Sequence, residues 1–375
     1  MLKTIDECFF QIQNGANIKQ GEVEGGFPIT RIETTSNDKF SRDRMGYAGI
    51  TDISKYKSYV LEDGDLLMSH INSVQYLGRT VLYVAKKDET IIHGMNLLRL
   101  KANRDIINPA YARYCFYGYP FKRQIANITK KSVNQASFAV KDLKKICIEV
   151  PTLSQQEKIV DVLDKLQSII DMRNQELEQL DTLIKARFVE LFGDPVSNSY
   201  GLPELALSEL GELGRGVSKH RPRNDSKLMN GDYPLIQTGD VAAANLYITS
   251  YNSTYSDLGL KQSKMWNKGT LCITIAANIA KTAILDFNAC FPDSVVGFIA
   301  NDKTTNIFIH YWFSFFQAIL ESQAPESAQK NINLKILSEL KVIVPDKNKQ
   351  DEFTEFIYQV TKSKFEGRMI IIGHR

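Results

Sequence analysis

The sequence predicts an α+β protein in which two repeated α/β domains are separated by long helices. Two observations carry this prediction. A heptad pattern of apolar residues runs through the middle of the 375-residue chain, and the segments on its two sides match one another in the same order. The length also exceeds one ordinary domain core, as two domains with a connecting helix would.

Composition limits the class of protein. Hydrophobic residues make up 43% of the chain and charged residues 24%, as in ordinary globular proteins. The five cysteines have no CxxC spacing, so we expect neither a disulfide framework nor a zinc site, and a reducing, cytoplasmic location is favoured. The N-terminus MLKTIDECFF does not resemble a secretory signal, and the apolar run 307–320 is too short to span a bilayer. The net charge is +3, with a basic surplus in the first 150 residues, which permits contact with nucleic acid.

Each copy of the repeat, 1–150 and 196–345, begins with short β-type runs. The clearest runs are 66–68 and 80–84 in the first copy and 271–275 and 282–285 in the second. An aromatic helix follows, opened in the first copy by Asn108 as N-cap and by Pro109. Each copy closes on a strand that ends at Pro151 or Pro345, and NQASFAVKDLKKICIEVP (134–151) overlies AQKNINLKILSELKVIVP (328–345). The preserved order of these matches favours a duplication.

The central segment 151–195 predicts a long helix, from 154 to 192. Its apolar residues follow four- and three-residue steps, which is a heptad pattern and predicts a partner helix outside this segment. This seam consists of Ile159, Leu163, Leu166, Ile170, Leu177, Leu180, Ile184 and Leu191. At about 1.5 Å per residue such a helix is roughly 58 Å long and could act as a spacer.

Three phrases of the sequence resemble a known family. The segment PTLSQQEKIVDVLDKLQSIIDMRNQELEQLDTLIKARFVELFGDP (151–195) resembles the central conserved region of DNA-specificity subunits of type I restriction–modification systems. YPLIQTGDV (233–241) and FPDSVVGFI (291–299) are similar to segments of the target-recognition domains of that family. With the duplication, the resemblance covers nearly the whole chain.

The resemblance implies a fold and a function. Two target-recognition domains would each read one half of a bipartite sequence in double-stranded DNA, and two conserved helices forming an antiparallel coiled coil would hold them apart. These helices would dock adenine-specific DNA methyltransferase subunits, and a restriction/translocase subunit would complete the enzyme. Catalysis would then belong to the partners, and S-adenosylmethionine would bind to the modification subunit, with no cofactor in this chain.

The lack of a complete catalytic motif in the sequence favours a non-catalytic role. Asn108-Pro109-Ala110-Tyr111 imitates a methyltransferase motif, but a capped helix start accounts for it. The chain contains no GxxxxGK[ST] phosphate loop. Its histidines lack the spacing of metal ligands, and no cluster of carboxylates predicts a nuclease site. We therefore expect no catalytic, cofactor-binding or metal-binding residues.

Candidate DNA contacts are Arg, Lys, Asn and Gln residues in loop-like segments, because these side chains pair with base edges and phosphates. In the first copy the candidates are Lys39, Arg42, Arg44, Asn72, Gln75, Arg79, Lys130, Lys131, Asn134 and Gln135. In the second copy they are Lys219, Arg221, Arg223, Lys227, Gln237, Lys261, Lys264, Lys281, Gln329 and Lys330. Each of them, taken singly, is also consistent with an ordinary solvated side chain that contacts no DNA. Their recurrence at parallel places in the two copies favours DNA contact for the groups.

The C-terminal segment 346–375 predicts a second helix that is shorter than the first. The seam is lost after Val360, and we expect the helix to stop at Gly367 because glycine is a poor helix former. A shortened helix would leave part of the central seam uncovered, which predicts self-association through that part. Two other functions stay open: a stand-alone bipartite DNA-binding regulator, and a coiled-coil scaffold that binds protein or carbohydrate.

Overall fold

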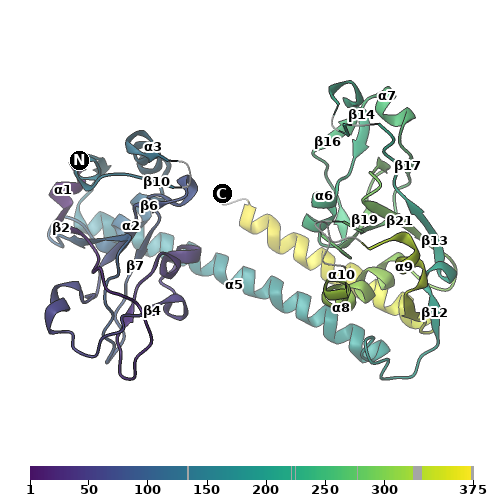
Figure 1. Ribbon diagram of the computed structural model, residues 1–375, viewed down its shortest axis with the longest axis horizontal. Coiled ribbons are helices and arrows are strands. Elements are labelled where there is room, and N and C mark those ends of the chain that lie inside the picture. Colours follow the sequence, from purple (N-terminus) through teal and green to yellow (C-terminus); the bar gives the residue numbers. More distant parts are fainter. Residues whose placement is uncertain (133–134, 221, 224, 277, 324–331, 373–375) are drawn as a thin grey trace. The chain divides into compact units, whose positions relative to one another are not determined.

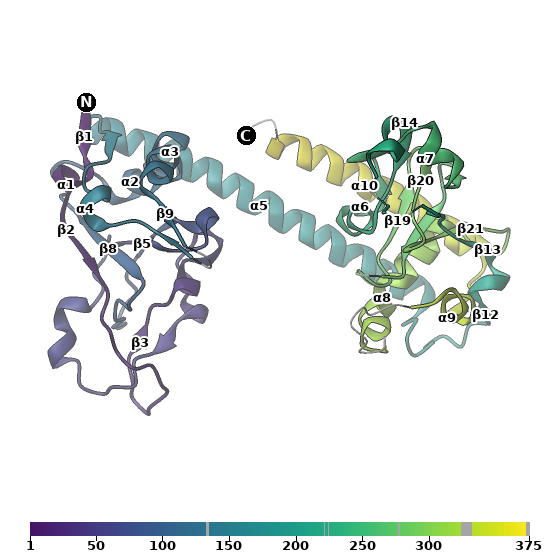
Figure 2. The same ribbon diagram turned by 45° about the horizontal axis from the view of Figure 1, so that its top comes forward.

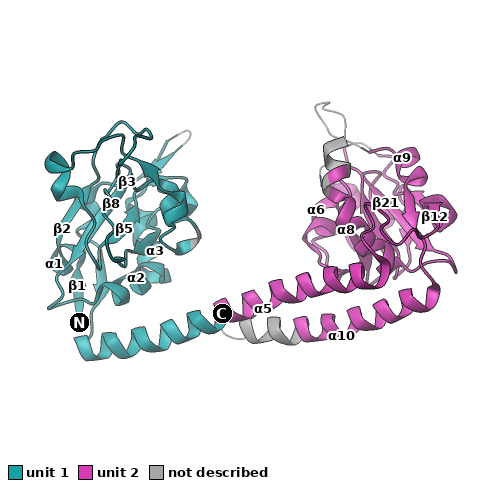
Figure 3. Cartoon of the chain, turned by 90° about the horizontal axis from the view of Figure 1, so that it is seen from below, with its two compact units in different colours: residues 1–169 teal, residues 170–375 magenta. Residues whose placement is uncertain are grey.

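A computed structural model describes the chain except for residues 133–134, 221, 224, 277, 324–331 and 373–375 (Figure 1). It contains two compact units, Met1–Ile169 and Ile170–Arg375, which Figure 3 colours separately. We describe each unit by itself. Both combine helices with mainly antiparallel sheets, and unit 2 also contains the parallel pairs β14–β20 and β15–β19. This agrees with the predicted mixed fold and its two-domain organisation.

Unit 1 is built on a four-stranded sheet with the order β2-β8-β5-β7. Its strands are β2 (Phe9–Asn14), β8 (Leu97–Ala102), β5 (Leu66–Ser69) and β7 (Thr80–Leu82), and neighbours are antiparallel. Successive side chains point to opposite faces, so Leu66 and Met68 join the core beneath the helices while Leu67 packs with Val81 on the other face. Both faces are therefore buried, which explains the continuous apolar runs that predicted these strands.

Two helices cover one face of this sheet, α2 (Pro109–Tyr117) and α3 (Tyr119–Ile128). The Oδ1 atom of Asn108 accepts the backbone N–H of Ala110 at 2.8 Å, so the predicted cap is confirmed. The expected aromatic helix is confirmed as α2. It ends at Tyr117, because Gly118 has an extended backbone, and α3 begins directly afterwards with Tyr119 and Pro120.

The remaining elements of unit 1 are short. The strands are β1 (Leu2–Thr4), β3 (Pro28–Ile29), β4 (Gly46–Tyr47), β6 (Ile71–Asn72), β9 (Lys130–Lys131), β10 (Ala136–Ser137) and β11 (Cys147–Glu149). The helical turns are α1 (Ile5–Cys8), η1 (Ile32–Asp38), η2 (Arg42–Arg44), η3 (Ser54–Tyr59), η4 (Val74–Tyr76) and α4 (Val140–Leu143). The first strand β1 pairs with the last strand β11.

Unit 2 contains a five-stranded sheet, β13-β21-β18-β19-β15, and a four-stranded sheet, β16-β14-β20-β17. Several of these strands are labelled in Figure 2. The strands are β12 (Glu204–Ala206), β13 (Gly211–Arg215), β14 (Met229–Leu235), β15 (Tyr247–Ile248), β16 (Ser253–Tyr255), β17 (Met265–Trp266), β18 (Leu271–Thr274), β19 (Thr282–Leu285), β20 (Ala289–Cys290), β21 (Val295–Ala300) and β22 (Lys341–Ile343). The helices are η5 (Leu207–Glu209), η6 (Ser226–Leu228), α6 (Thr238–Ala243), α7 (Asp257–Lys261), α8 (Asn306–Gln323), α9 (Leu334–Glu339) and α10 (Lys347–Ile372).

The two units repeat one plan. The order β2-β8-β5-β7 of unit 1 recurs as β13-β21-β18-β19 in unit 2, and the pair β1–β11 recurs as β12–β22. The turn before the third sheet strand is also shared, because Gly64 and Gly269 both have a φ of 89°. Other residues rarely adopt this left-handed conformation. The cap of the large helix differs, since Thr305 rather than Asn306 caps α8, through a 3.0 Å hydrogen bond from the Phe308 N–H to the Thr305 hydroxyl.

The long helix is α5 (Leu153–Phe192), which begins one residue before the predicted start and ends where predicted. Its first part belongs to unit 1, where Val160 joins the core. Its second part packs against α10 within unit 2, as Figure 3 shows. The two segments run antiparallel, as the ion pairs of Arg187 with Glu352 (2.5 Å) and of Asp181 with Lys364 show.

The predicted seam residues differ in burial. Ile184 is buried, Leu180 and Leu191 pack partly against the core of unit 2, and Ile159 and Leu166 are exposed. The intermediate seam residues Leu163, Ile170 and Leu177 are half-buried. Phe188 and Phe192, which the heptad analysis did not select, are fully buried beside Ile184.

The expected end of the C-terminal helix at Gly367 is wrong. α10 continues through this glycine to Ile372. An interior glycine costs about 1 kcal/mol relative to alanine, which weakens a helix but does not have to end it.

Candidate nucleic-acid interface

One end of unit 1 collects two of the candidate segments in a small sheet. Strand β10 pairs with β6 on one side and with β9 on the other, so that Ala136 lies opposite both Asn72 and Lys131. The segment 69–79 and the segment 130–135 are therefore neighbours, and Figure 1 shows β6 beside β10. Lys130, Lys131, Gln75 and Gln135 are exposed there, whereas the amide of Asn72 donates to the Ser69 hydroxyl at 3.2 Å. Asn134 lies outside the described residues.

Arg79 connects this sheet to the third candidate segment, 39–44. Its guanidinium forms a 3.0 Å ion pair with Asp38 and lies 4.6 Å from the centre of the Tyr76 ring. Cation–π stacking and the ion pair together hold Arg79 in one orientation. Lys39 and Arg44 are exposed in the adjacent loop.

Arg42 is held inside its own unit. It donates to both carboxylate oxygens of Glu89, at 2.9 and 2.5 Å, and to the carbonyl of Val84 at 2.8 Å. The hydrogen bond from Arg42 lowers the pKa of Glu89 to about 2, so the pair stays charged at neutral pH. This pairing gives Arg42 a role in fastening the loop, and Arg44 is the more exposed of the two arginines in this segment.

In unit 2 the basic segment 218–227 lies against the turn that follows β20. Arg223 forms an ion pair with Asp293, and the backbone N–H of Lys219 donates to Gln262 at 2.7 Å. Lys219 and Lys227 are exposed, and Arg221 lies outside the described residues. The pKa of Asp225 is lowered, first by a hydrogen bond from the Lys227 backbone and then by one from His220, which keeps this carboxylate charged inside the loop.

A pocket of about 170 Å³ opens beside this segment. It is lined by Arg223, Met229, Leu235, Gln237, Thr238, Tyr255, Pro292 and Ser294. The pocket lies where the phrases 233–241 and 291–299 meet, because Leu235 is the parallel partner of Cys290. The lining combines apolar side chains with the polar groups of Arg223, Gln237 and Thr238.

The other candidates of unit 2 occupy separate places. Lys261 is exposed at the end of α7, and the Lys264 ammonium lies 3.8 Å from the centre of the Trp266 ring. Lys281 is half-buried before β19. Gln329 and Lys330 lie outside the described residues.

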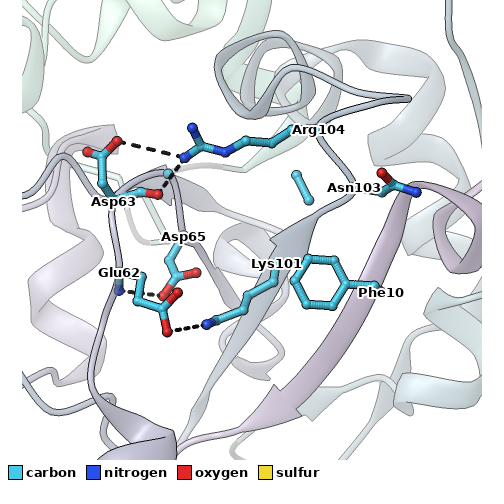
Figure 4. Close-up of a pocket in the computed structure, with 9 residues that line it drawn as sticks. Phe10, Glu62, Asp63, Asp65, Lys101, Asn103 and Arg104 are labelled. Carbon is cyan, nitrogen blue, oxygen red and sulfur yellow. Dashed lines mark hydrogen bonds and ion pairs between the residues drawn. The ribbon is translucent and has the colours of Figure 1, made fainter.

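The opposite end of the unit 1 sheet carries a second pocket, of about 290 Å³ (Figure 4). Its charged residues neutralise one another: Glu62 pairs with Lys101 at 2.6 Å and Asp63 with Arg104 at 3.7 Å. Deeper in the unit, Arg99 is almost fully buried and donates to the carbonyls of Ser58 and Val60. This pocket presents no surplus of positive charge, so we do not assign it to nucleic acid.

Sequence reasoning missed two residues of these surfaces. Asp293 could not be assigned as the partner of Arg223, because the two are far apart in the sequence. Arg31 was overlooked although it follows the phrase FPIT, which matches YPLI. Carrying that match one residue further would have aligned Arg31 with Gln237.

The described residues of these surfaces provide hydrogen-bond donors and cations. Among the residues that the structure describes, no group of three or more His, Cys, Asp or Glu residues could hold a metal ion. Within the same ranges, no helix is both long and apolar enough to cross a membrane. The shared plan of the two units defines the class of protein as one built from two related domains.

The chain belongs to the type I restriction modification DNA specificity family, whose model matches residues 3–182 and 204–368. Specificity subunits of this family recognise DNA and are not themselves catalytic. A putative type I restriction enzyme specificity subunit, MjaX, of Methanocaldococcus jannaschii is 29% identical over 355 residues, covering 90% of this chain and 81% of the relative. The EcoKI specificity subunit of Escherichia coli is 24% identical over 162 residues, covering 43% of this chain and 34% of the relative.

Solved structures share the fold. The specificity subunit of a type I system from M. genitalium superposes with a TM-score of 0.59 at 12% identity, covering all of this chain and 92% of the other. A chain from a structure of a type I restriction–modification complex superposes with a TM-score of 0.57 at 15% identity, covering 99% and 93%. At these identities the likeness supports the fold alone.

Proposed function

We propose that this specificity subunit reads a bipartite target in double-stranded DNA, with one half of the target contacted by each unit. The observation that carries the proposal is the duplication. The four-strand order of unit 1 recurs within the five-stranded sheet of unit 2, and each unit presents exposed cations and carboxamides. We assign residues 1–150 and 196–345 as the two recognition domains, and 151–195 and 346–375 as the conserved helices that form an antiparallel coiled coil.

We further propose that α5 docks adenine-specific methyltransferase subunits. Four apolar residues on its first part are substantially exposed, namely Ile159 (38%), Val162 (57%), Leu166 (37%) and Ile169 (43%). Exposed apolar residues at helical spacing favour a partner helix. Methyl transfer from S-adenosylmethionine is assigned to that partner, and cleavage with translocation to a restriction subunit, so no cofactor is assigned to this chain.

Domain exchange tests the bipartite assignment. Residues 1–150 are replaced by the corresponding domain of another member of the family, and methylated motifs are sequenced in a host that carries the modification subunits. We expect one half of the motif to change and the other to stay. A change in both halves would contradict the division of labour, and the absence of any bipartite motif with the unaltered gene would contradict the function.

Co-purification tests the docking surface. The double variant Ile159→Asp, Leu166→Asp should lose the modification subunit, whereas Lys158→Asp and Lys165→Asp on the same helix should keep it. Light scattering over a dilution series of the chain alone tests a second copy as the alternative occupant. A monomer at every concentration would remove self-association as an explanation for this exposed surface.

A further inference from the structure

The same backbone corner occurs once in each unit. In unit 1, Ile29 forms a parallel bridge with Ile92, and the Thr30 N–H donates to the Ile92 carbonyl at 3.0 Å. The next residue is Arg31, an exposed side chain. The position of Arg31 in the fold is therefore fixed by the contacts of Ile29 and Thr30, the two residues just before it.

In unit 2 the corresponding contacts involve β14 and β20. Leu235 is the parallel partner of Cys290, and the Ile236 N–H donates to the Cys290 carbonyl at 2.9 Å. The next residue is Gln237, which is also exposed. Arg31 and Gln237 therefore occupy equivalent positions.

The turns that follow these residues are also equivalent. The Arg31 N–H donates to the Thr34 hydroxyl at 2.8 Å, and the Gln237 N–H donates to the Asp240 carboxylate at 2.8 Å. The backbone angles agree, with φ and ψ of −124° and 175° at Arg31 and of −111° and 170° at Gln237. The two side chains thus leave the backbone in the same way, although their chemistry differs.

Each position has an arginine-bearing segment beside it. In unit 1 the Thr34 hydroxyl also donates to the carbonyl of Arg44 at 3.4 Å, which brings the segment 39–44 next to Arg31. In unit 2, Arg223 and Gln237 line the same pocket. The Arg31 guanidinium is steadied by a hydrogen bond to Gln20 and lies over Gly46, where any Cβ atom would come within 2.2 Å of its Nε atom.

We propose that Arg31 and Gln237 are equivalent base-reading residues, with Arg31 selecting guanine and Gln237 selecting adenine in the major groove. The scaffold is constant while the side chain differs, as expected where two copies of one domain read different sequences. An arginine matches the O6 and N7 acceptors of guanine, and a glutamine carboxamide matches the N6 donor and N7 acceptor of adenine. This inference rests on the proposed function.

Reciprocal substitution tests the assignment in the full chain assembled with its modification subunits. Arg31→Gln should change or relax one guanine position in one half of the methylated motif, and Gln237→Arg should do the same at one adenine position in the other half. Competition binding with duplexes that differ at that base should show discrimination falling about 10- to 100-fold. A wild-type protein without a bipartite motif would overturn the proposed function itself.

Two further variants separate base reading from charge and from folding. Arg31→Lys keeps the positive charge but loses the fork of donors, so it should retain DNA binding and lose discrimination. Arg44→Gln should weaken binding to all sequences alike. If the wild-type protein reads a bipartite motif but Arg31→Lys keeps full discrimination, or Arg31→Gln weakens all sequences equally, the inference about Arg31 and Gln237 is overturned.

Discussion

Gln156 and Gln350 are buried residues whose carboxamides make equivalent hydrogen bonds in the two units. The Gln156 amide donates to the carbonyls of Ile106 and Pro151, both at 2.9 Å, and its oxygen accepts the Asn108 N–H. The Gln350 amide donates to Lys303 and Pro345, both at 3.0 Å, and its oxygen accepts the Thr304 hydroxyl. Each glutamine therefore fastens the start of a long helix to the domain before it.

Replacing Gln350 with leucine should destabilise unit 2 by on the order of 2–4 kcal/mol, because three hydrogen bonds of buried groups are lost. Urea unfolding followed by tryptophan fluorescence measures this, since the only two tryptophans, Trp266 and Trp312, lie in unit 2. The control is Gln359→Leu, an exposed position on the same helix. Equal effects at the two positions would contradict the fastening role of Gln350.

His310 should make the stability of unit 2 depend on pH. Its Nδ1 lies 2.9 Å from the Thr282 hydroxyl, and burial lowers its pKa to about 4. The folded state therefore keeps this histidine neutral, while the unfolded state binds a proton below about pH 6.5. Stability is fully present above that pH and is lost as the pH falls toward 4, by at most about 1.4 kcal/mol per pH unit.

Urea midpoints at pH 7, 6 and 5 check this expectation. His310→Gln should flatten the dependence, because it removes the buried imidazole whose pKa is lowered in the folded state. If the stability of the His310→Gln variant still depends on pH, groups other than His310 cause the dependence.

At the scale of elements, strong periodic patterns were predictable and short pairings were not. Strands β5 and β18 and helix α5 appear where continuous apolar runs and heptads predicted them. The sheet β6-β10-β9 consists of two-residue strands, which are too short to carry a pattern. The surface near Arg79 was predicted as separate loops, because only the folded chain brings Asp38 to Arg79.

The sequence predicted that α5 packs against a partner helix, but it did not predict which residues of α5 are buried in that contact. A heptad analysis favours aliphatic positions, whereas the aromatic residues Phe188 and Phe192 surround Phe353 at centroid distances of 5.4 and 5.6 Å. Three buried rings in mutual edge-to-face contact provide more buried surface than the half-exposed leucines of the seam.

Phe188→Ala should therefore cost unit 2 about 3–5 kcal/mol, as expected for a buried aromatic side chain. The neighbouring Val189 is 38% exposed, and Val189→Ala is the matched control, with an expected cost below about 1 kcal/mol. Urea unfolding followed by tryptophan fluorescence compares the two. A larger effect at Val189 would show that the two faces of α5 have been assigned in reverse.

At the scale of the whole molecule, DNA binding should depend strongly on salt. Cations that neutralise phosphates release counterions, and about six such contacts weaken binding roughly a thousandfold between 50 and 200 mM salt. The double variant Lys130→Gln, Lys131→Gln should reduce the salt slope by about two. Lys101→Gln, at the charge-paired pocket on the opposite end of the sheet, should not change it. Fluorescence anisotropy with a labelled duplex measures both slopes, and affinity independent of salt would favour a scaffold that binds protein or carbohydrate.

The pairing of β1 with β11 also sets the order in which the protein becomes structured during its synthesis. Leu2 lies opposite Glu149, and Glu204 lies opposite Ile343, so each unit joins its first strand to one made far later. Such distant pairings are slow to form. While the ribosome extends a unit, its opening strand has no partner and its core is incomplete. Each unit is therefore expected to close only when its last strand emerges, immediately before the helix that it anchors.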